Sequence, residues 1–118
     1  MNIILCTDLI FSTKITGTAK ALNQPYAVAR TLDKLQQLLD AATTTPTAST
    51  RIILDLNITG IDPIAVIQLA KSHPSSPHIT AFLSHVQVAP AAAARTAGAD
   101  RVLPRSTFTA ELPQILSP

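Results

Sequence analysis

The sequence predicts a doubly wound α/β domain, in which helices cover both faces of a five-stranded parallel sheet. Along all 118 residues, short apolar runs alternate with segments whose apolar residues recur every three or four positions. The apolar runs do not alternate with polar residues, as expected of strands that are buried on both faces. Strands that alternate with helices require right-handed crossovers, so we expect a single domain over residues 1–118.

Composition excludes several classes of protein. Hydrophobic residues make up 47% of the chain and charged residues 14%, which is typical of a globular domain and not of disorder. The formal net charge is +2 and the charges form no run, so nucleic acid is not an expected partner. The apolar start, residues 1–11, has no basic region and contains Asp8, so we expect no membrane segment. The single cysteine, Cys6, excludes an internal disulfide and favours a cytoplasmic protein.

The first half of the chain predicts two strands and two helices. Residues 2–6 and 26–30 are the expected strands, and apolar side chains at helical spacing predict a helix over 10–22. Thr31 can cap a second helix. That helix would present one apolar stripe, formed by Leu32, Leu35, Leu38, Leu39 and Ala42. Residues 42–50 have no apolar period and predict a loop.

The middle of the chain predicts two further strands, over 51–56 and 79–84, separated by a helix and a turn at 72–78. Asp62 and Pro63 predict the start of that helix, because a carboxylate can cap it and proline is tolerated at its first position.

The last part predicts an alanine-rich helix that Pro90 opens and Gly98 closes, and then a fifth strand over 100–104. A final helix should start late enough for Pro113 to be tolerated. Its expected cap is one of Ser106, Thr107 and Thr109, and its expected apolar face is Phe108, Leu112, Ile115 and Leu116.

Polar side chains directly follow four of the predicted strands. In a doubly wound sheet the ligand site lies beyond the carboxyl ends of the strands, so these side chains should share one crevice. They are Thr7, Asp8, Asp55, Asn57, Ser84, His85 and Arg105.

Two segments of the chain resemble motifs of the receiver domain of two-component response regulators. "LDLNITGIDP" is similar to the family's "LDxxMPxMDG", and "AGADRVLPRSTFTAEL" is similar to its "AGAxxYLxKPFxxxEL". The resemblance covers nearly the whole chain and implies a flavodoxin-like sheet of strand order 2-1-3-4-5. It also implies a phosphorelay role without enzymatic turnover of a substrate.

The resemblance assigns a role to five residues. Asp55 falls on the phosphoacceptor, Asp8 on one of the two acids that hold Mg²⁺, and Asn57 on the residue whose backbone carbonyl binds the metal. Ser84 falls on the conserved hydroxyl and Arg105 on the invariant lysine. The chemistry requires these types, because a carboxylate that attacks a phosphoryl group needs Mg²⁺ and a cation to offset negative charge.

The chain departs from the family pattern at five positions in or near this pocket. Thr7 replaces the other acid of the metal site, so we expect a weak or absent Mg²⁺ site at Asp8, Asp55 and Asn57. Arg105 replaces lysine and can pair with Asp55 through its planar fork, which would mimic a fixed state. The other departures are Pro63 for glycine, Val102 for the switching aromatic and Ser106 for proline.

These departures favour a pseudo-receiver, a stand-alone signalling domain with a degenerate acidic pocket that acts by protein–protein contact. Because the chain ends with the domain, we expect its partner to be another signalling protein or a second copy. The expected contact face is the alanine-rich helix together with residues 102–116. Two alternatives remain: a true Mg²⁺-dependent receiver phosphorylated on Asp55, and a small-molecule sensor or enzyme on the same scaffold.

Three of the pocket residues also have ordinary structural interpretations, which the sequence leaves open. Asp8 can cap the first helix, Asp55 can simply order the loop that follows its strand, and Ser84 can bond to nearby backbone.

The remaining histidines and the cysteine favour structural roles. His85 lies beside the pocket, but a lone histidine is more often a surface hydrogen-bonding residue. His73 and His78 flank a turn with no carboxylate or cysteine near them in the sequence, so a metal site is not expected there. Cys6 lies in a predicted buried strand and should pack.

Overall fold

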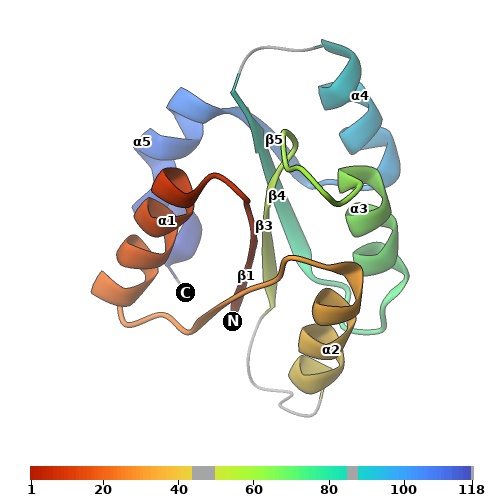
Figure 1. Cartoon of the computed structure of the whole chain (residues 1–118), viewed down its shortest axis with the longest axis horizontal. Helices are drawn as coiled ribbons and strands as arrows, with labels where there is room; N and C mark the ends of the chain where they lie inside the picture. Colours follow the sequence, from red (N-terminus) through yellow and green to blue (C-terminus); the bar gives the residue numbers. More distant parts are fainter. Residues whose placement is uncertain (44–49, 85–87, 118) are drawn as a thin grey trace.

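The structure, a computed structural model, describes residues 1–43, 50–84 and 88–117 (Figure 1). It contains one parallel sheet of order β2-β1-β3-β4-β5, which confirms the predicted fold. The strands are β1 Asn2–Leu5, β2 Tyr26–Val28, β3 Arg51–Asp55, β4 His78–Leu83 and β5 Arg101–Pro104. The helices are α1 Leu9–Ala21, α2 Leu32–Thr43, α3 Pro63–Ser72, α4 Val88–Ala97 and α5 Arg105–Leu116.

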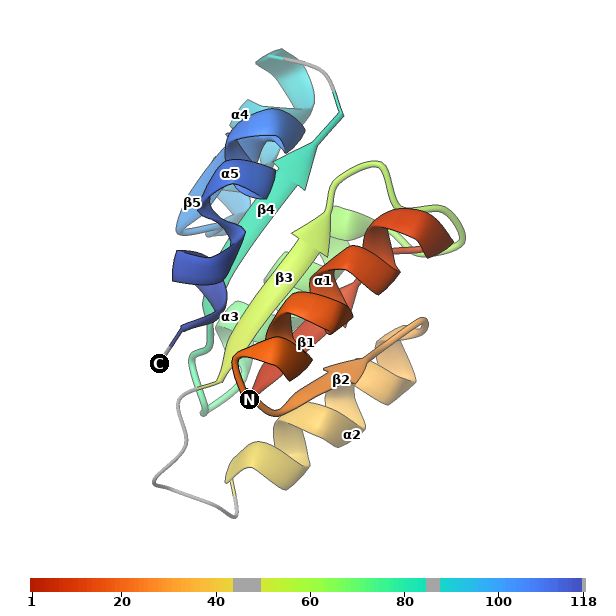
Figure 2. The same ribbon diagram turned by 90° about the vertical axis from the view of Figure 1, so that its left-hand side faces the viewer.

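Helices form a layer on each face of the sheet. Figures 1 and 2 show α1 and α5 on one face and α2, α3 and α4 on the other. Successive residues of a strand point to opposite faces, so each strand contributes to two apolar clusters. Ile4, Ile53 and Phe82 pack under α1 and α5, whereas Leu5 and Leu54 belong to the cluster under the other three helices.

Three helix ends confirm their sequence signals. Asp8 caps α1 by accepting a hydrogen bond from the Phe11 N–H, and Asp62 caps α3 with Pro63 as its first residue. Gly98 follows α4 with φ +121° and donates its N–H to α4 carbonyls.

The last two helices correct the sequence prediction at their prolines. α4 begins at Val88, so Pro90 is its third residue, within the first turn, where N–H groups have no helical partner anyway. Pro113 lies inside α5 and not near a late start. Its position is tolerated because the loss of one hydrogen bond near the end of α5 is offset by the burial of the predicted apolar face: Phe108, Leu112, Ile115 and Leu116.

The predicted caps of α5 are wrong. The helix begins directly after β5, with Pro104 as its N-cap and no side-chain cap. The hydroxyl groups predicted to cap it therefore do not do so: Ser106, Thr107 and Thr109. Thr109 instead donates its hydroxyl to the carbonyl of Arg105 inside the helix. The direct strand-to-helix junction places Arg105 at the carboxyl edge of the sheet.

Other differences are small. Strand bounds shift by one or two residues, and His78 begins β4 where the sequence predicts a turn. Leu32 was expected in the apolar stripe of α2 but is 37% exposed, because it lies in the first turn of a helix that packs beside the edge strand. The predicted loop at 42–50 falls mainly on residues outside the described part.

Candidate functional site

The candidate site lies at the carboxyl ends of β1 and β3 and at the start of α5. Asp8 follows β1, Asp55 is the last residue of β3, and Arg105 is the first residue of α5. The fold brings these three predicted residues into contact. Ser84 and Asn57 lie at the same edge but pair with each other, as described below.

Asp55 is a buried carboxylate, 2% exposed, with a fixed orientation. Its Oδ1 accepts a hydrogen bond of 2.8 Å from the Asn57 N–H, so Asp55 orders the loop that follows its own strand. Its Oδ2 faces the Cys6 thiol at 3.6 Å and the guanidinium of Arg105 at 3.7 Å. Asp55 therefore has two roles: one carboxylate oxygen orders the loop after β3, and the other belongs to the charged pocket.

Arg105 bridges the two carboxylates of the site. One terminal nitrogen lies 3.5 Å from Asp8 Oδ2 and the other 3.7 Å from Asp55 Oδ2. The guanidinium therefore does not form the bidentate fork on Asp55 that arginine chemistry allows. It contacts each carboxylate once and neutralises part of the charge of both.

Aromatic packing holds the guanidinium in this position. Its central carbon lies 4.4 Å from the ring centroid of Phe11 and 5.9 Å from that of Phe82, within the range of cation–π attraction. The buried Nε of Arg105 has no hydrogen-bond partner among the described residues. Stacking and charge, more than directional hydrogen bonds, therefore position this side chain.

Phe11 is a site residue that the sequence did not reveal as one. In the sequence Phe11 is one of the apolar residues at helical spacing in the helix predicted over 10–22, which marks it only as a core residue. Its N–H binds Asp8 Oδ1 while its ring supports Arg105, so one helical turn orders both charged partners. The sequence signal that could have identified Phe11 is its position three residues after Asp8, where a backbone N–H commonly binds the capping side chain.

Asp8 therefore has both roles that the sequence left open for its position, a helix cap and a member of the charged pocket. Oδ1 caps α1, and Oδ2 faces Arg105. Its side chain is 43% exposed, so water screens its ion pair far more than that of Asp55.

Asn57 and Ser84 form a separate polar link between the loops after β3 and β4. Asn57 Oδ1 accepts hydrogen bonds from the N–H of Ser84 at 2.8 Å and from its hydroxyl at 3.1 Å. Ser84 thus bonds a neighbouring side chain and not the backbone partner that the sequence suggested. The bond fixes the two loops beside Asp55.

The site does not fit a Mg²⁺ ion of the kind that the family resemblance implies. Thr7 stands in place of an acid, and its hydroxyl bonds the hydroxyl and N–H of Thr59 at 3.2 Å. The two remaining carboxylates both face Arg105. Within residues 1–43, 50–84 and 88–117, no three His, Cys, Asp or Glu side chains form a group that could hold a metal.

Cys6 has the packing environment expected of a structural thiol. Its side chain is buried between β1 and the site, with Sγ 3.7 Å from the carbonyl oxygen of Asp8. Burial, with a smaller contribution from the charge of Asp55, raises the pKa of Cys6 to about 11. The thiol is therefore protonated, and unreactive, at neutral pH.

His73 has a carboxylate partner that its neighbours in the sequence do not supply. The ring is buried, and its Nε2 lies 2.9 Å from Oδ1 of Asp40, a residue of α2 that is distant in sequence. The hydrogen bond from His73 lowers the pKa of Asp40. The pair joins the carboxyl-terminal parts of α2 and α3, which is a structural role. His85 lies outside the described residues.

Comparisons with known proteins agree with this architecture. No protein-family model matches the chain, and no curated protein matches it. Solved structures do match, among them the signal receiver domain of a DNA-binding response regulator from Colwellia psychrerythraea 34H. The TM-score is 0.74 and the identity 16%, over 98% of this chain and 96% of that chain. The chain has the receiver-domain fold.

Two further receiver structures show the same fold. The receiver domain of NtrX from Brucella abortus matches with a TM-score of 0.74 and 14% identity, over 98% of this chain and 93% of that chain. A response regulator from Burkholderia pseudomallei matches with a TM-score of 0.72 and 15% identity, over 97% and 69%. The latter structure holds a phosphorylated aspartic acid, a calcium ion and citrate.

No described helix is both long enough and apolar enough to cross a bilayer.

Proposed function

We propose that this protein is a receiver-like signalling domain that acts through protein–protein contacts and whose acidic pocket is closed by its own arginine. The contact of Arg105 with both Asp8 and Asp55 carries this proposal. In a phosphorylated receiver, charge at this position is balanced by Mg²⁺ and by a lysine. Here a single guanidinium faces both carboxylates.

An arginine at this position favours a permanent state of the pocket. The planar guanidinium stacks on the ring of Phe11, whereas the ammonium group of a lysine would remain hydrated. A Mg²⁺ ion that bound Asp8 and Asp55 would have to displace the guanidinium from both carboxylates, and it would compete with a cation that is already in place. The pocket therefore favours the state with Arg105 in place over one with an added charge.

The proposed contact surface is formed by α4, β5 and α5, and the partner is another signalling protein or a second copy of this chain. β5 contacts both helices, α4 on one face of the sheet and α5 on the other (Figure 1). Arg105 begins α5 immediately after β5, so the pocket is directly connected to this surface. A fixed arginine would hold the surface in one arrangement.

The test is an amide NMR titration of the folded protein with Mg²⁺ and beryllofluoride, a mimic of the phosphoryl group. The proposal predicts no saturable shifts at the amides of residues 55–58 and 84 in the wild type. The matched control is Asp55→Asn, which cannot accept a phosphoryl group. Saturable wild-type shifts that are lost in Asp55→Asn would overturn the proposal in favour of a true phosphoacceptor.

A further inference from the structure

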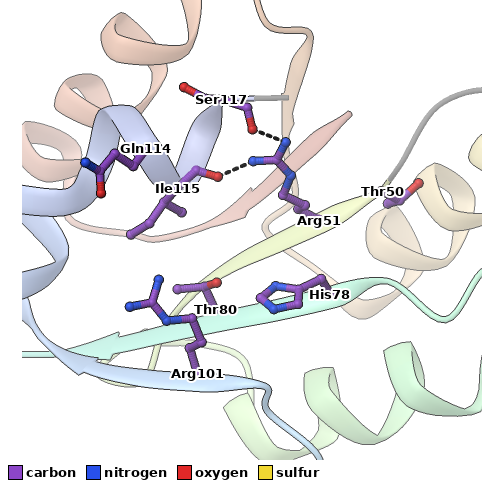
Figure 3. A pocket seen from close by; sticks show the side chains of 8 residues that line it. All are labelled: Thr50, Arg51, His78, Thr80, Arg101, Gln114, Ile115 and Ser117. Atoms are coloured by element: carbon purple, nitrogen blue, oxygen red, sulfur yellow. Dashed lines mark hydrogen bonds between the residues drawn. The ribbon is translucent and has the colours of Figure 1, made fainter.

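A second pocket lies at the opposite end of the sheet, beside the end of α5. Its volume is about 420 Å³, within the range of small-molecule sites. It is open to solvent, and Figure 3 shows the side chains that line it. The lining residues are Thr50, Arg51, His78, Thr80, Arg101, Gln114, Ile115 and Ser117.

The register of three strands explains why this pocket is polar. Arg51 is paired with His78, and Thr80 with Arg101, in adjacent strands. These residues share the face of the sheet that is apolar further along, at Ile53 and at Phe82. The amino ends of β3, β4 and β5 therefore present basic and hydroxyl groups where α5 ends.

Positive charge dominates the lining. It includes two guanidinium groups and one imidazole, and no carboxylate side chain. Arg51 donates to the carbonyl oxygens of Ile115 and Ser117, which holds its guanidinium at the rim (Figure 3). Arg101 pairs with Glu111 at 3.0 Å, but both side chains are at least one-third exposed, so water screens that pair.

Thr80 contributes a hydroxyl group to the floor of the pocket. Its side chain is almost fully buried, 3% exposed, yet it lines the pocket. No hydrogen bond of its hydroxyl is formed with any residue in the described part of the chain. Its hydroxyl oxygen is not one of the fully buried polar atoms that lack a partner, so it is open to the pocket and can bond to water or to a bound molecule there.

We propose that this pocket binds a small phosphate monoester whose organic part is polar. A phosphate monoester carries two negative charges, so as a ligand it matches two guanidinium groups better than a carboxylate ligand with one charge. Arginine also favours planar, charge-assisted contacts with phosphate oxygens. Hydroxyl and amide groups of Thr50, Gln114 and Ser117 suit an organic part that carries hydroxyl groups. The lining contains no Phe, Tyr or Trp ring, and the imidazole of His78 is its one surface on which a nucleobase could stack, so we favour a hydroxylated, sugar-like phosphate over a nucleotide.

The experiment is an amide NMR titration with glucose 6-phosphate as the probe, at pH 7 and constant ionic strength. Inorganic phosphate, glucose and acetate are the comparison ligands. The proposal predicts saturable shifts at residues 51, 78, 80 and 101 with glucose 6-phosphate, weaker binding of inorganic phosphate, and none with glucose. Equal responses to acetate and glucose 6-phosphate, or shifts that never saturate, would overturn it.

Four variants identify the pocket as the binding site. Arg101→Gln should lower the affinity by about tenfold, because a charge-assisted hydrogen bond is lost. Arg95→Gln removes the same charge from the exposed surface of α4 and should leave the affinity unchanged. Thr80→Val keeps the shape of the strand and should weaken binding, whereas Glu111→Gln releases Arg101 and should strengthen it.

An equal loss in Arg95→Gln and Arg101→Gln would contradict the proposal, since it would indicate a general charge effect. The acidic site at the other end of the sheet plays no part in this binding. The result is therefore independent of the outcome of the beryllofluoride titration.

Discussion

At the residue scale, the choice of arginine at position 105 decides what the acidic site can do. Two carboxylates that share a partly buried site repel each other unless a cation lies between them. Arg105 supplies that cation and stacks on Phe11, so the ring and the charges select the same side-chain position. A lysine could supply the charge but not the flat surface for stacking.

Arg105→Met should destabilise the folded protein, because Asp55 is buried and loses its cation. We expect a loss of about 1 to 2 kcal/mol, which is less than for a fully buried pair since Arg105 is 30% exposed. Urea unfolding measures the loss. The same substitution in an Asp55→Asn background should cost about 1 kcal/mol less. Strictly additive effects would contradict an Asp55–Arg105 interaction.

The thiol of Cys6 should make stability depend on pH in the alkaline range. Because folding raises its pKa from 9.0 to about 11, its contribution is complete below pH 9 and is lost as the pH rises towards 11. Urea unfolding of wild type and Cys6→Ala across this range measures that contribution. The variant should show the shallower decline, and parallel curves would contradict the prediction.

At the element scale, helix ends that depend on one local residue could be predicted from the sequence. Asp8, Asp62 and Gly98 act through their own side chain or backbone preference, and all three mark helix ends as expected. The start of α5 could not be predicted, because it follows from a direct junction with β5 and from burial of Phe108. Tertiary packing there outweighs the local preference for a hydroxyl cap.

Two glycine substitutions separate local strain from helix propensity. Gly98→Ala should destabilise the protein by about 1 to 2 kcal/mol, because φ is +121° and a Cβ would lie 2.8 Å from Lys71 Cγ. Gly17→Ala, inside α1 and facing open space, should stabilise it by about 0.5 to 1 kcal/mol. Thermal unfolding of both variants measures these opposite shifts, and shifts of the same sign would contradict the account.

At the scale of the whole molecule, the sheet carries opposite chemistry at its two ends. The carboxyl ends of its strands hold Asp8 and Asp55 around one arginine. The amino ends hold Arg51, His78 and Arg101 around an open pocket. Between them, on the same face, three phenylalanine rings pack against one another: Phe11 from α1, Phe82 from β4 and Phe108 from α5.

That aromatic cluster makes the acidic site part of the core. Phe108→Ala should destabilise the protein by about 3 to 5 kcal/mol, because its ring stacks on Phe82 at 4.3 Å and is fully buried. It should also shift the amides around Arg105, which rests on the same cluster. Urea unfolding and amide NMR spectra measure the two effects. A comparable loss in the exposed-site control Thr13→Ala would contradict this explanation.

The location of the acidic site in the fold could be predicted from the sequence, but the contacts between its side chains could not. Topology alone places Asp8, Asp55 and Arg105 at one edge of a parallel sheet. The bridging position of Arg105 depends on the ring of Phe11, and the bond from Ser84 to Asn57 depends on how two loops meet. Neither of these contacts can be deduced from the spacing of residues along the sequence. The basic pocket arises from strand register, which the sequence pattern does not specify for residues at strand ends.

The central claim is that Arg105 neutralises the two carboxylates that a Mg²⁺ ion would need, and a Mg²⁺ titration tests it most directly. Amide NMR spectra are recorded for the wild type and for Thr7→Asp combined with Arg105→Lys, which restores the family's residue types. We predict saturable shifts around Asp8 and Asp55 in the double variant and none in the wild type. Saturable Mg²⁺ binding by the wild type at these residues would contradict the claim.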